Sequence, residues 1–482
     1  MNQQHEQMLL NSWQERQEYA EQMLPLLGKL YRDKAVEFTV FGKPLLGASV
    51  IDIIKAHRSV RLYREQKLKV RYSCSLLQKL ADLPLSPAKI DLGQLAYGYY
   101  HEGRGENQAI DSYLQQQLAD IIENEDEHAP QDVVLYGFGR IGRLLARMLI
   151  QRQGRNNKMR LRAIVVRGNK DGDLEKRASL LRRDSVHGPF NGSITVDHEC
   201  SALKANGSFI HVIYADSPEQ VDYTQYGIDN AIVIDNTGAW RDEAGLACHL
   251  KAKGAAKVLL TAPGKGEIKN VVYGVNHSDI TLDDTIMSAA SCTTNAITPI
   301  LKVLDEKFGI ENGHVETVHS YTNDQNLIDN YHKADRRGRS ASLNMVITET
   351  GAAKAVAKAY PNLKGKLTGN AIRVPTPNVS LAILNLTTET PVSTQGVNDY
   401  LREMSLFSEL QDQIDFTAST EIVSTDLVGS RAACVVDSQA TITAGNRVTL
   451  YIWYDNEFGY SCQVIRVAMA MAGLTMKTLP QW

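Results

Sequence analysis

The spacing of apolar and polar residues divides the chain near residue 130. Residues 1–130 are rich in Gln, Leu, Glu and Lys, which are good helix formers. Apolar positions at helical spacing predict helices over about 5–31, 48–82 and 108–123, separated by breaks that contain Gly and Pro. The acidic stretch from Glu123 to Pro130 indicates a linker. We therefore expect an all-helical N-terminal extension.

Short apolar runs alternate with segments of helical pattern after Pro130. Such runs are typical of a parallel sheet covered by helices on both faces. From about residue 313 the strands lengthen and alternate, as in Val315–His319 and Val448–Trp453, which predicts a half-exposed and mostly antiparallel sheet. The five short runs are Val133–Tyr136, Ala163–Val166, Ile210–Ile213, Ala231–Ile234 and Lys257–Leu260.

A glycine-rich turn follows the first of these runs. The hexapeptide Gly137-Phe138-Gly139-Arg140-Ile141-Gly142 has the pattern G-x-G-x-x-G and opens the amphipathic stretch Ile141–Gln151. In such a turn the first Gly permits a tight bend, the second lets backbone N–H groups approach a pyrophosphate, and the third allows close helix–strand packing. We predict a Rossmann-type dinucleotide site; the alternative is a glycine-rich turn without a ligand.

The residue that follows the second run bears on the choice of dinucleotide. An Asp or Glu at this place accepts hydrogen bonds from the adenosine ribose and repels a 2′-phosphate. Arg167 occupies it here and can pair with that phosphate instead. The alternative, equally weighted, is a solvated Arg at a strand end.

A candidate nucleophile lies at the start of a predicted helix. Cys292, in Ser291–Asn295, precedes the apolar positions of a helix whose positive dipole end stabilises a thiolate. His319 lies in the alternating strand, and a His within reach can activate the thiol and exchange a substrate proton. By spacing alone, either residue can equally be an inert core group.

Seven motifs that occur in a fixed order favour a catalytic role for Cys292 and His319 over the alternative of inert core residues. Together they resemble the phosphorylating glyceraldehyde-3-phosphate dehydrogenase family over about residues 131–482, and residues 1–130 lie outside the resemblance, as in a long form with an N-terminal extension. The motifs are YGFGRIG (Tyr136–Gly142), DSVHG (Asp184–Gly188), SCTTN (Ser291–Asn295), HSYTNDQ (His319–Gln325), TGAAKA (Thr350–Ala355), KLTGNAIRVPTPNVS (Lys366–Ser380) and WYDNEFGYS (Trp453–Ser461).

The resemblance implies a reaction and its two catalytic residues. Cys292 resembles the nucleophile that attacks the aldehyde carbon, and His319 the base that takes the hydroxyl proton while hydride passes to NAD or NADP. Inorganic phosphate, the co-substrate, then attacks the thioester. The implied enzyme is an oxidoreductase of glycolysis or gluconeogenesis that reversibly converts glyceraldehyde 3-phosphate to 1,3-bisphosphoglycerate.

The resemblance also implies the binding residues. Arg373 would supply charge for the substrate phosphate, Asp324 would orient Arg373, and Arg339 would assist from the loop His332–Arg339 or be solvated. Asn456 would fix the nicotinamide carboxamide, with Tyr460 near that ring. The other substrate and phosphate positions are Thr322 for the substrate and Ser291, Thr293, Thr350 and Gly351 for the attacking phosphate, and the other cofactor positions are Thr237, Gly238 and Thr261.

Four departures from the family pattern stand out. Tyr136 replaces the Asn that usually precedes the first Gly, and Arg167 replaces the usual ribose Asp. The loop Asn330-Tyr331-His332 lacks the Leu-Pro pair of strictly NAD-using members, and Ala296 replaces a second Cys. The catalytic set is therefore intact, while the adenosine end is altered in favour of NADP use at least comparable with NAD use.

The fold implied by the resemblance has three parts. An all-α extension (1–130) precedes a Rossmann doubly wound NAD(P)-binding domain (131–290) and an α+β catalytic domain with a mixed sheet (291–456). A C-terminal helix of about 457–482 would return to the Rossmann domain. Family members form homotetramers, in which the loop 324–342 would reach a neighbour's cofactor.

Composition excludes several other classes of protein. The net charge of −3 and the pI of about 6.5 argue against nucleic acid or an anionic membrane as partner. Six Cys without tight spacing indicate free thiols and no metal site. The N-terminus lacks a signal-peptide pattern and no apolar run approaches a membrane span, so we expect a cytoplasmic protein.

One feature of the extension leaves its role open. Five basic residues recur every third position and would form a drifting basic stripe on a helix. The stripe is a solvated face, or it docks an unknown anionic partner or the acidic segment Glu123–Glu127. The residues are Lys55, Arg58, Arg61, Arg64 and Lys67.

Two other functions remain possible from the sequence. Erythrose-4-phosphate dehydrogenase shares the motifs and most of the site. A regulatory or scaffold protein could keep the fold and use the extension to bind a partner, although such a protein has no need of Cys292, His319 and Arg373 together.

Overall fold

Two compact units make up the chain in the computed structural model, which describes residues 3–106, 108–122, 129–152, 158–168, 171–474 and 476–481. One unit, here called the extension unit, contains residues 1–130 with the short segments 152–158 and 474–482. The other, the core unit, contains residues 131–151 and 159–473. The acidic residues 123–128, proposed above as a linker and a docking segment, lie outside the described residues.

The extension unit is mainly helical but also contains a sheet. Its strands have the order β2-β1-β3-β21, in which β1 pairs antiparallel with β2 and parallel with β3. The expectation of an all-helical extension is therefore wrong. The helices are α1 (Gln3–Lys34), α2 (Val50–Ser59), α3 (Val70–Leu80), α4 (Leu92–His101) and α5 (Ile110–Gln117), and the strands are β1 (Val36–Val40), β2 (Lys43–Pro44), β3 (Ala88–Asp91) and β21 (Lys477–Leu479).

Asp91 explains why a strand and a helix join where they do. Its buried carboxylate accepts hydrogen bonds from the backbone N–H of Phe41 and Gly42 in the β1–β2 turn. It also accepts from the N–H of Gln94 and so caps the start of α4. One side chain thus fixes the hairpin turn against the helix.

The predicted helix over 48–82 is interrupted. Ser49 begins α2 through a capping box with Asp52, and the helix gives way after Ser59 to a 3₁₀ turn at Val60–Leu62. Helix α3 begins only at Val70. The five basic residues are consequently spread over α2, this turn and the following loop, where Arg64 forms an ion pair with Glu102 at 3.3 Å, so they do not form a stripe on one helix.

The C-terminal segment belongs partly to the extension unit. Helix α12 (Phe458–Met471) packs against α6 (Arg140–Gln151) in the core unit. The helix then ends, and β21 pairs in parallel with β3, with Leu479 buried opposite Ile90. The expected helix to residue 482 is therefore too long, because the last residues are a strand of the other unit.

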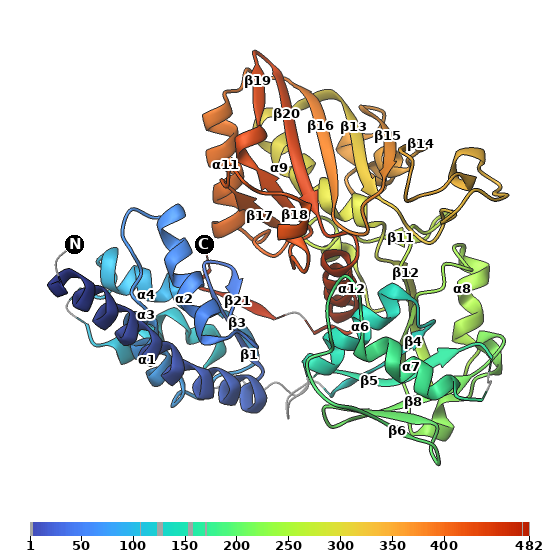
Figure 1. Cartoon of the computed structure of the whole chain (residues 1–482), viewed down its shortest axis with the longest axis horizontal. Helices are drawn as coiled ribbons and strands as arrows, with labels where there is room; N and C mark the ends of the chain where they lie inside the picture. The colour runs from blue at the N-terminus through green and yellow to red at the C-terminus, as the bar shows by residue number, and fades with distance from the viewer. Residues whose placement is uncertain are drawn as a thin grey trace. The chain divides into compact units, whose positions relative to one another are not determined.

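The first sheet of the core unit has nine strands. Its central strands follow the order β8-β5-β4-β9-β10-β12 and are all parallel, which is the doubly wound Rossmann arrangement (Figure 1). All five predicted runs lie in these strands. The strands are β4 (Gln131–Tyr136), β5 (Met159–Val166), β6 (Ile194–Asp197), β7 (Ala202–Ala205), β8 (Ser208–Tyr214), β9 (Ala231–Asp235), β10 (Ala255–Leu260), β11 (Lys269–Asn270) and β12 (Ile286–Ser288), and the further helices are α7 (Asp173–Arg182) and α8 (Glu243–Leu250).

The second sheet of the core unit is mixed, as predicted. Strands β13 and β15 are parallel, as are β17 and β18, and the other pairs are antiparallel. The elements are β13 (Ile310–Ser320), β14 (Val346–Glu349), β15 (Leu367–Val374), β16 (Ser380–Thr388), β17 (Ile414–Thr417), β18 (Cys434–Asp437), β19 (Ile442–Ala444) and β20 (Arg447–Tyr454), with helices α9 (Cys292–Phe308), α10 (Ala352–Ala359) and α11 (Thr394–Phe407).

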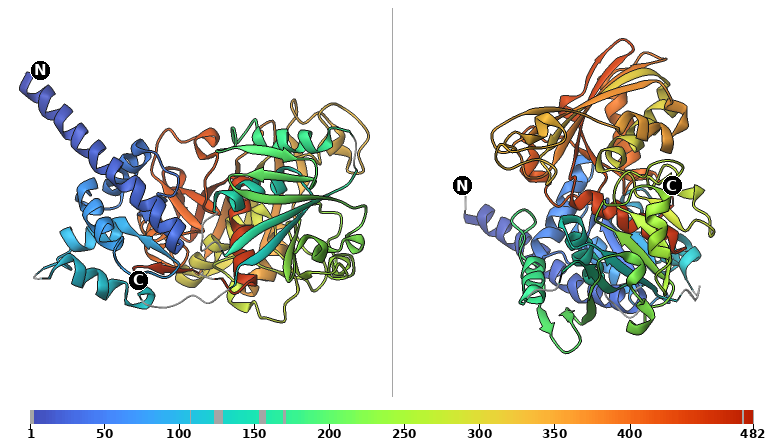
Figure 2. Two further views of the ribbon diagram at one scale, coloured as in Figure 1. Left: turned by 90° about the horizontal axis from the view of Figure 1, so that it is seen from below. Right: turned by 90° about the vertical axis from the view of Figure 1, so that its right-hand side faces the viewer.

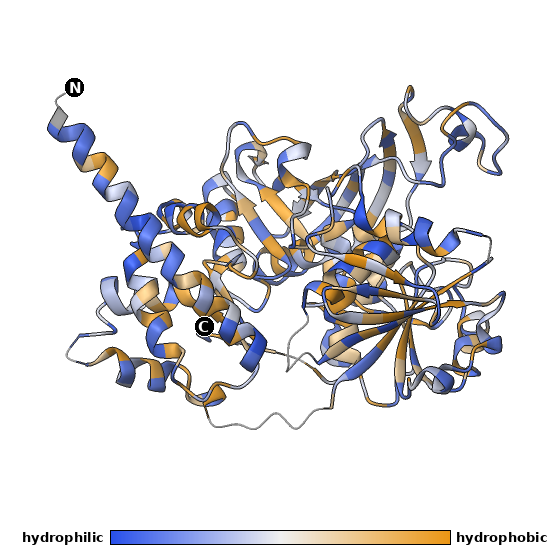
Figure 3. Cartoon of the chain, turned by 60° about the horizontal axis from the view of Figure 1, so that its bottom comes forward, coloured by the Kyte–Doolittle hydropathy of each residue, from blue (hydrophilic) through white to orange (hydrophobic). Residues whose placement is uncertain are grey.

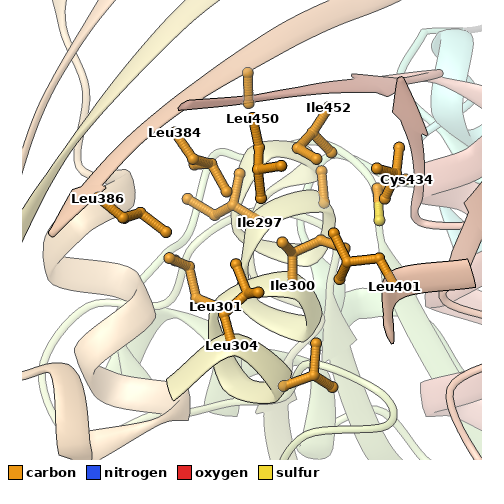
Figure 4. Close-up of a cluster of buried hydrophobic side chains, with 14 of the residues drawn as sticks. Ile297, Ile300, Leu301, Leu304, Leu384, Leu386, Leu401, Cys434, Leu450 and Ile452 are labelled. Carbon is orange, nitrogen blue, oxygen red and sulfur yellow. The ribbon is translucent and has the colours of Figure 1, made fainter. Parts of the chain in front are cut away.

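Helix α9 is anchored by an apolar core against this sheet. Its buried side chains Ile297, Ile300, Leu301 and Leu304 lie against side chains of β16 and β20 (Figure 4). Strand β20 buries every second residue, which is the period of a sheet with one covered face. The first turn of α9 is held in place by this packing.

The division into two units generates a prediction about truncation. We expect residues 131–473 to fold without the extension, because nearly all of this range forms the core unit with its own apolar core. Retaining residues 474–482 should reduce solubility, since β21 would lose its pairing with β3. Far-ultraviolet circular dichroism and gel filtration of chains 131–473 and 131–482 test this; an unfolded 131–473 chain would contradict it.

Candidate active site

The loop before α9 holds Cys292 at the first turn of the helix. The Ser291 hydroxyl caps this helix by accepting from the N–H of Thr294 at 3.0 Å. The Asn295 amide donates to the carbonyls of Ala289 and Ser291 at 2.8 and 2.9 Å. The half-buried thiol is therefore fixed beside the N–H groups of a helix start, where a negative charge is stabilised.

His319 faces the thiol from the end of β13. Its Nε2 lies 3.5 Å from Cys292 Sγ, and its Nδ1 lies 2.7 Å from the carbonyl oxygen of Ser320. In the tautomer whose Nδ1–H donates to that carbonyl, the lone pair of Nε2 is directed at the sulfur. The two residues, 27 positions apart in sequence, thus meet as a nucleophile and base would.

Arg373 completes this group through the pairing of β13 with β15. It is the register partner of His319, and its Nη1 donates to Ser320 O at 3.2 Å and lies 2.8 Å from His319 Nδ1. Burial and the Arg373 charge lower the pKa of His319 to about 3, so the imidazole is neutral. Burial raises the pKa of the Cys292 thiol, and the Arg373 charge opposes that rise.

The predicted partner of Asp324 is wrong. Its carboxylate forms an ion pair with Arg337, in the 3₁₀ turn Asp335–Gly338, while Arg373 bonds as described above. Arg339 pairs with Asp329 at 3.0 Å on the exposed surface. Arg337 is therefore the loop arginine whose charge acts on His319 and Arg373, and no sequence signal distinguishes it from the two neighbouring arginines.

The hydroxyl positions predicted for phosphate binding have local roles as well. Thr293 Oγ1 lies 3.0 Å from the hydroxyl of Tyr454, and Thr350 Oγ1 accepts from the N–H of Ala352 at 3.2 Å. Gly351 caps the start of α10, and Thr322 lies exposed in the turn after β13. These residues keep hydroxyl and N–H groups at the starts of α9 and α10.

The glycine-rich turn has the space that a pyrophosphate needs. Gly137 has a φ of +94°, and a side chain there would come within 2.9 Å of Thr237 Cγ2. A Cβ at Gly142 would lie 2.5 Å from the Gly137 carbonyl oxygen, so this Gly is required for packing. Around Gly139, by contrast, a Cβ would meet no described heavy atom within 4 Å. The open backbone, beside Phe138 and Ile141 at the start of α6, fits a dinucleotide.

The side chain of Arg140 binds carboxylates of the protein. It forms ion pairs with Glu457 and with Asp184, the latter at 3.3 Å. His187 Nε2 lies 3.0 Å from the same Glu457 carboxylate, whose pKa burial would raise but the bonds from His187 and Arg140 lower. This buried network joins the glycine-rich turn, the DSVHG motif and the residue after Asn456.

The nicotinamide-side residues are tied to the catalytic loop. Asn456 Oδ1 accepts from the Ser380 hydroxyl at 2.9 Å, which orients its NH₂ group as a donor. The Tyr460 hydroxyl donates to the Ala290 carbonyl at 2.9 Å. Helix α12 therefore holds the segment just before Cys292.

The adenosine-side residues collect at the carboxyl ends of β4, β5 and β9. Arg167 follows β5 and is exposed. Tyr136 is buried with its ring edge-on to His249, and its hydroxyl has no hydrogen-bond partner among the residues described. Burial raises the pKa of Tyr136 to about 12, against the nearby Arg167 charge. A buried orphan hydroxyl beside an exposed Arg is compatible with a ligand at this edge.

The loops after β9 and β10 are organised by Asp235. Its fully buried carboxylate accepts from the N–H and hydroxyl of Thr237 at 2.7 and 2.6 Å and lies 3.3 Å from His249 Nε2. Thr261 bonds the Asp235 carbonyl through both its N–H and its hydroxyl, at 3.0 Å each. Thr237, Gly238 and Thr261 are thereby brought to one edge of the sheet.

Comparison of the sequence with models of protein families identifies the family of the chain. The model of the glyceraldehyde 3-phosphate dehydrogenase NAD binding domain matches residues 131–243, and that of the C-terminal domain of the same enzyme matches residues 291–456. The chain belongs to the glyceraldehyde-3-phosphate dehydrogenase family.

Relatives within this family fall into two groups by length. A glyceraldehyde-3-phosphate dehydrogenase-like protein of Pseudomonas aeruginosa is 58% identical over 463 residues, which is 95% of this chain and all of the relative. Glyceraldehyde-3-phosphate dehydrogenase of Zymomonas mobilis is 40% identical over 70% of this chain and 98% of its own length. The chloroplastic dehydrogenase A of Zea mays is 41% identical over 70% of this chain and 81% of its own length. The Pseudomonas relative therefore shares the extension as well.

No helix within the described ranges is long and apolar enough to cross a membrane. Among the same residues, no group of three or more His, Cys, Asp or Glu side chains is placed to hold a metal ion.

The Arg140 network generates a prediction about stability. Replacing Glu457 by Ala leaves the Arg140 guanidinium and the His187 Nε2 without their shared carboxylate. We expect the free energy of unfolding to fall by about 1–3 kcal/mol, the cost of an unsatisfied buried polar group. Urea unfolding measures this. Glu306→Ala is the matched control, because it breaks an exposed ion pair with Lys302 on α9 and should change stability by less than about 0.5 kcal/mol.

Proposed function

We propose that the chain is an NAD(P)-dependent phosphorylating glyceraldehyde-3-phosphate dehydrogenase. Its reaction is the reversible conversion of glyceraldehyde 3-phosphate and inorganic phosphate to 1,3-bisphosphoglycerate. The observation that carries the proposal is the 3.5 Å contact of Cys292 Sγ with His319 Nε2, beside Arg373. The relatives of Zymomonas mobilis and Zea mays bear the name of this activity.

Cys292 begins the reaction by attacking the aldehyde carbon. Its proton passes to Nε2 of His319, which lies within reach and is neutral. The new carbon–sulfur bond leaves an oxyanion that N–H groups at the start of α9 stabilise, and this oxyanion takes the proton back from Nε2 to give the hemithioacetal hydroxyl. A thiolate suits this step because it is a good nucleophile and, later, a good leaving group.

His319 then serves the oxidation step. The bound nicotinamide supplies the hydride acceptor. As the hydride leaves the carbon, Nε2 takes the hydroxyl proton, and the Nδ1–H bond to Ser320 holds the ring in the required tautomer. Inorganic phosphate next attacks the thioester, and the carbon–sulfur bond breaks to return the Cys292 thiolate.

Two anion sites would flank the thiol. For the substrate phosphate we propose Arg373 and Thr322, with the Asp324–Arg337 ion pair bordering the site. The attacking phosphate would meet hydroxyl and N–H groups at the starts of two helices. These groups come from Ser291, Thr293, Thr350 and Gly351.

The dinucleotide would lie along the carboxyl edge of the Rossmann sheet. The open backbone around Gly139 would receive the pyrophosphate, and the Asn456 amide would donate to the nicotinamide carboxamide. Thr237, Gly238 and Thr261 would line the cofactor side. Arg140 would contribute its backbone N–H at the helix start, because its side chain is held by Glu457.

We further propose a cytoplasmic homotetramer. The loop around residues 324–347 carries large apolar side chains in the open, including Tyr331 at 91% and Leu343 at 81% exposure. Exposed apolar surface of this kind is typical of a subunit interface. The remaining members are Leu327, Ile328, Met345 and Ile347.

A steady-state assay tests the proposed reaction. We expect reduction of the dinucleotide with glyceraldehyde 3-phosphate to depend on inorganic phosphate or arsenate, because a thioester needs an acceptor. Cys292→Ser should lose turnover while keeping cofactor affinity, and His319→Asn should lower the rate by about 10²–10⁴, the worth of a positioned base.

The assay also separates the other candidate functions. Faster turnover of erythrose 4-phosphate than of glyceraldehyde 3-phosphate would reassign the substrate. No turnover of either aldehyde, or turnover of Cys292→Ser within tenfold of the parent, would contradict the proposed enzyme.

Cofactor choice gives a second prediction. A hydrogen bond from the Arg167 guanidinium to a 2′-phosphate would add about 1.5–3 kcal/mol, which is roughly 10- to 150-fold in affinity. We expect NADP to be used at least as well as NAD. Titration of cofactor binding, together with kcat/KM for each cofactor, measures this in the parent and in Arg167→Asp.

Arg177→Ala is the matched control for that substitution. Arg177 donates to the Arg167 carbonyl, so its removal changes charge nearby without removing the side chain in question. A parent that prefers NAD by more than tenfold, or an Arg167→Asp chain that does not shift toward NAD, would show that Arg167 is only a solvated residue.

A further inference from the structure

The first half of α1 is exposed along most of its length, and at Glu15 it meets α3 through an ion pair with Arg71 at 3.5 Å. Helix α1 has 32 residues, about 48 Å at 1.5 Å per residue, whereas α3, which packs along it, has only 11. Residues 4–15 are exposed. Figure 2 shows this end of α1 projecting from the rest of its unit.

The buried apolar residues of α1 lie on a seam whose spacing continues into the projecting half, where two of its four positions are apolar and two are charged. Ala20, Met23, Leu27 and Leu30 are buried at intervals of three and four residues, the spacing of a coiled-coil seam. Counting back at the same intervals reaches four residues of the projecting half: Arg16, Trp13, Leu9 and Glu6.

This seam therefore continues beyond the part of α1 in which its residues are buried. Leu9 is 53% and Trp13 38% exposed, and Figure 3 shows orange among the blue of the projecting half. An apolar face of this kind on an otherwise polar helix is stable when another helix covers it.

We propose that the projecting half of α1 pairs with the same segment of a second copy of this chain, in antiparallel orientation. In an antiparallel pair centred between residues 9 and 13, Leu9 of one helix faces Trp13 of the other. The same register places Glu6 of each helix opposite Arg16 of the other. The segment is thus complementary to itself in both apolar contact and charge, as a two-fold interface requires.

Arg16 is placed to serve such a pair. Its guanidinium carbon lies 5.4 Å from the centre of the Trp13 ring, and its Nε donates to the Ser12 carbonyl. The cation therefore lies next to the aromatic residue on the seam. A parallel pair would instead place Arg16 opposite Arg16 and Glu6 opposite Glu6, which repel.

Disulfide trapping tests the pair in the full chain, because an interface of about three turns is small and a covalent bond captures a weak contact. Chains carrying Leu9→Cys and Trp13→Cys are mixed and oxidised, with Cys200 and Cys248 replaced by Ser in every chain. We expect at least about tenfold more covalent dimer from the mixture than from either chain alone, because facing residues bring their Cβ atoms within disulfide reach. Met8→Cys, also exposed but off the seam, is the matched control.

Exchange of the facing charges provides a second test of the helix pair. Glu6→Arg and Arg16→Glu, each introduced into the trapping chains, should lower the yield, because either change places like charges opposite each other. A mixture in which one chain carries Glu6→Arg and the other Arg16→Glu should restore it, since every facing pair is again of opposite sign. Far-ultraviolet circular dichroism of each chain confirms that it is folded.

Three results would overturn the proposal. They are a mixture that yields no more dimer than the Met8→Cys control, stronger linking of Leu9→Cys to itself than to Trp13→Cys, and equal yields for matched and mismatched charges. The first result would mean that a different partner covers the seam, and the second would mean that the two helices pair in parallel. The test does not depend on the proposed reaction.

Discussion

The parallel pairing of β13 with β15 determines where the reactive groups meet. That register sets His319 beside Arg373 on adjacent strands, and the carbonyl of Ser320 receives hydrogen bonds from both. Helix α9, packed on the same sheet, brings Cys292 to the imidazole. A shift of one residue in the register would turn one of the two side chains to the other face, so the site depends on this pairing more than on any single contact.

A second constraint is the burial of charge between the dinucleotide turn and α12. Arg140, Glu457 and His187 come from three motifs far apart in the sequence, and the buried carboxylate of Glu457 is costly without its bonds to the other two. The network holds the residue after Asn456 against the start of α6. In the proposed cofactor site the network would couple the placement of a nicotinamide to that of a pyrophosphate, which gives a structural reason for an arginine in the glycine-rich turn.

The sequence predicted the strands of the core unit but not all of the contacts between its side chains. Apolar runs located the Rossmann strands because a buried parallel strand needs a continuous apolar stretch. The motifs located Cys292 and His319, which the fold brings together. The partner of Asp324 was not predictable, because the loop geometry that selects Arg337 over Arg339 is set by tertiary contacts such as the Arg339–Asp329 ion pair. The strands of the extension were missed because they are short and come from distant segments.

The strand β21 changes how the extension should be understood. A three-residue strand after a helix carries too little alternation to be found by pattern, yet it completes the sheet that begins at β1. Residues from both ends of the chain therefore form one unit, and only residues 472–476 separate α12 from that strand. Because α12 follows directly on Asn456 and Glu457, the chain that leaves the nicotinamide-side residues ends in the extension's sheet. The extension is thus joined to the catalytic core at both ends of that core, and removing residues 1–130 alone would leave β21 without its partner strand.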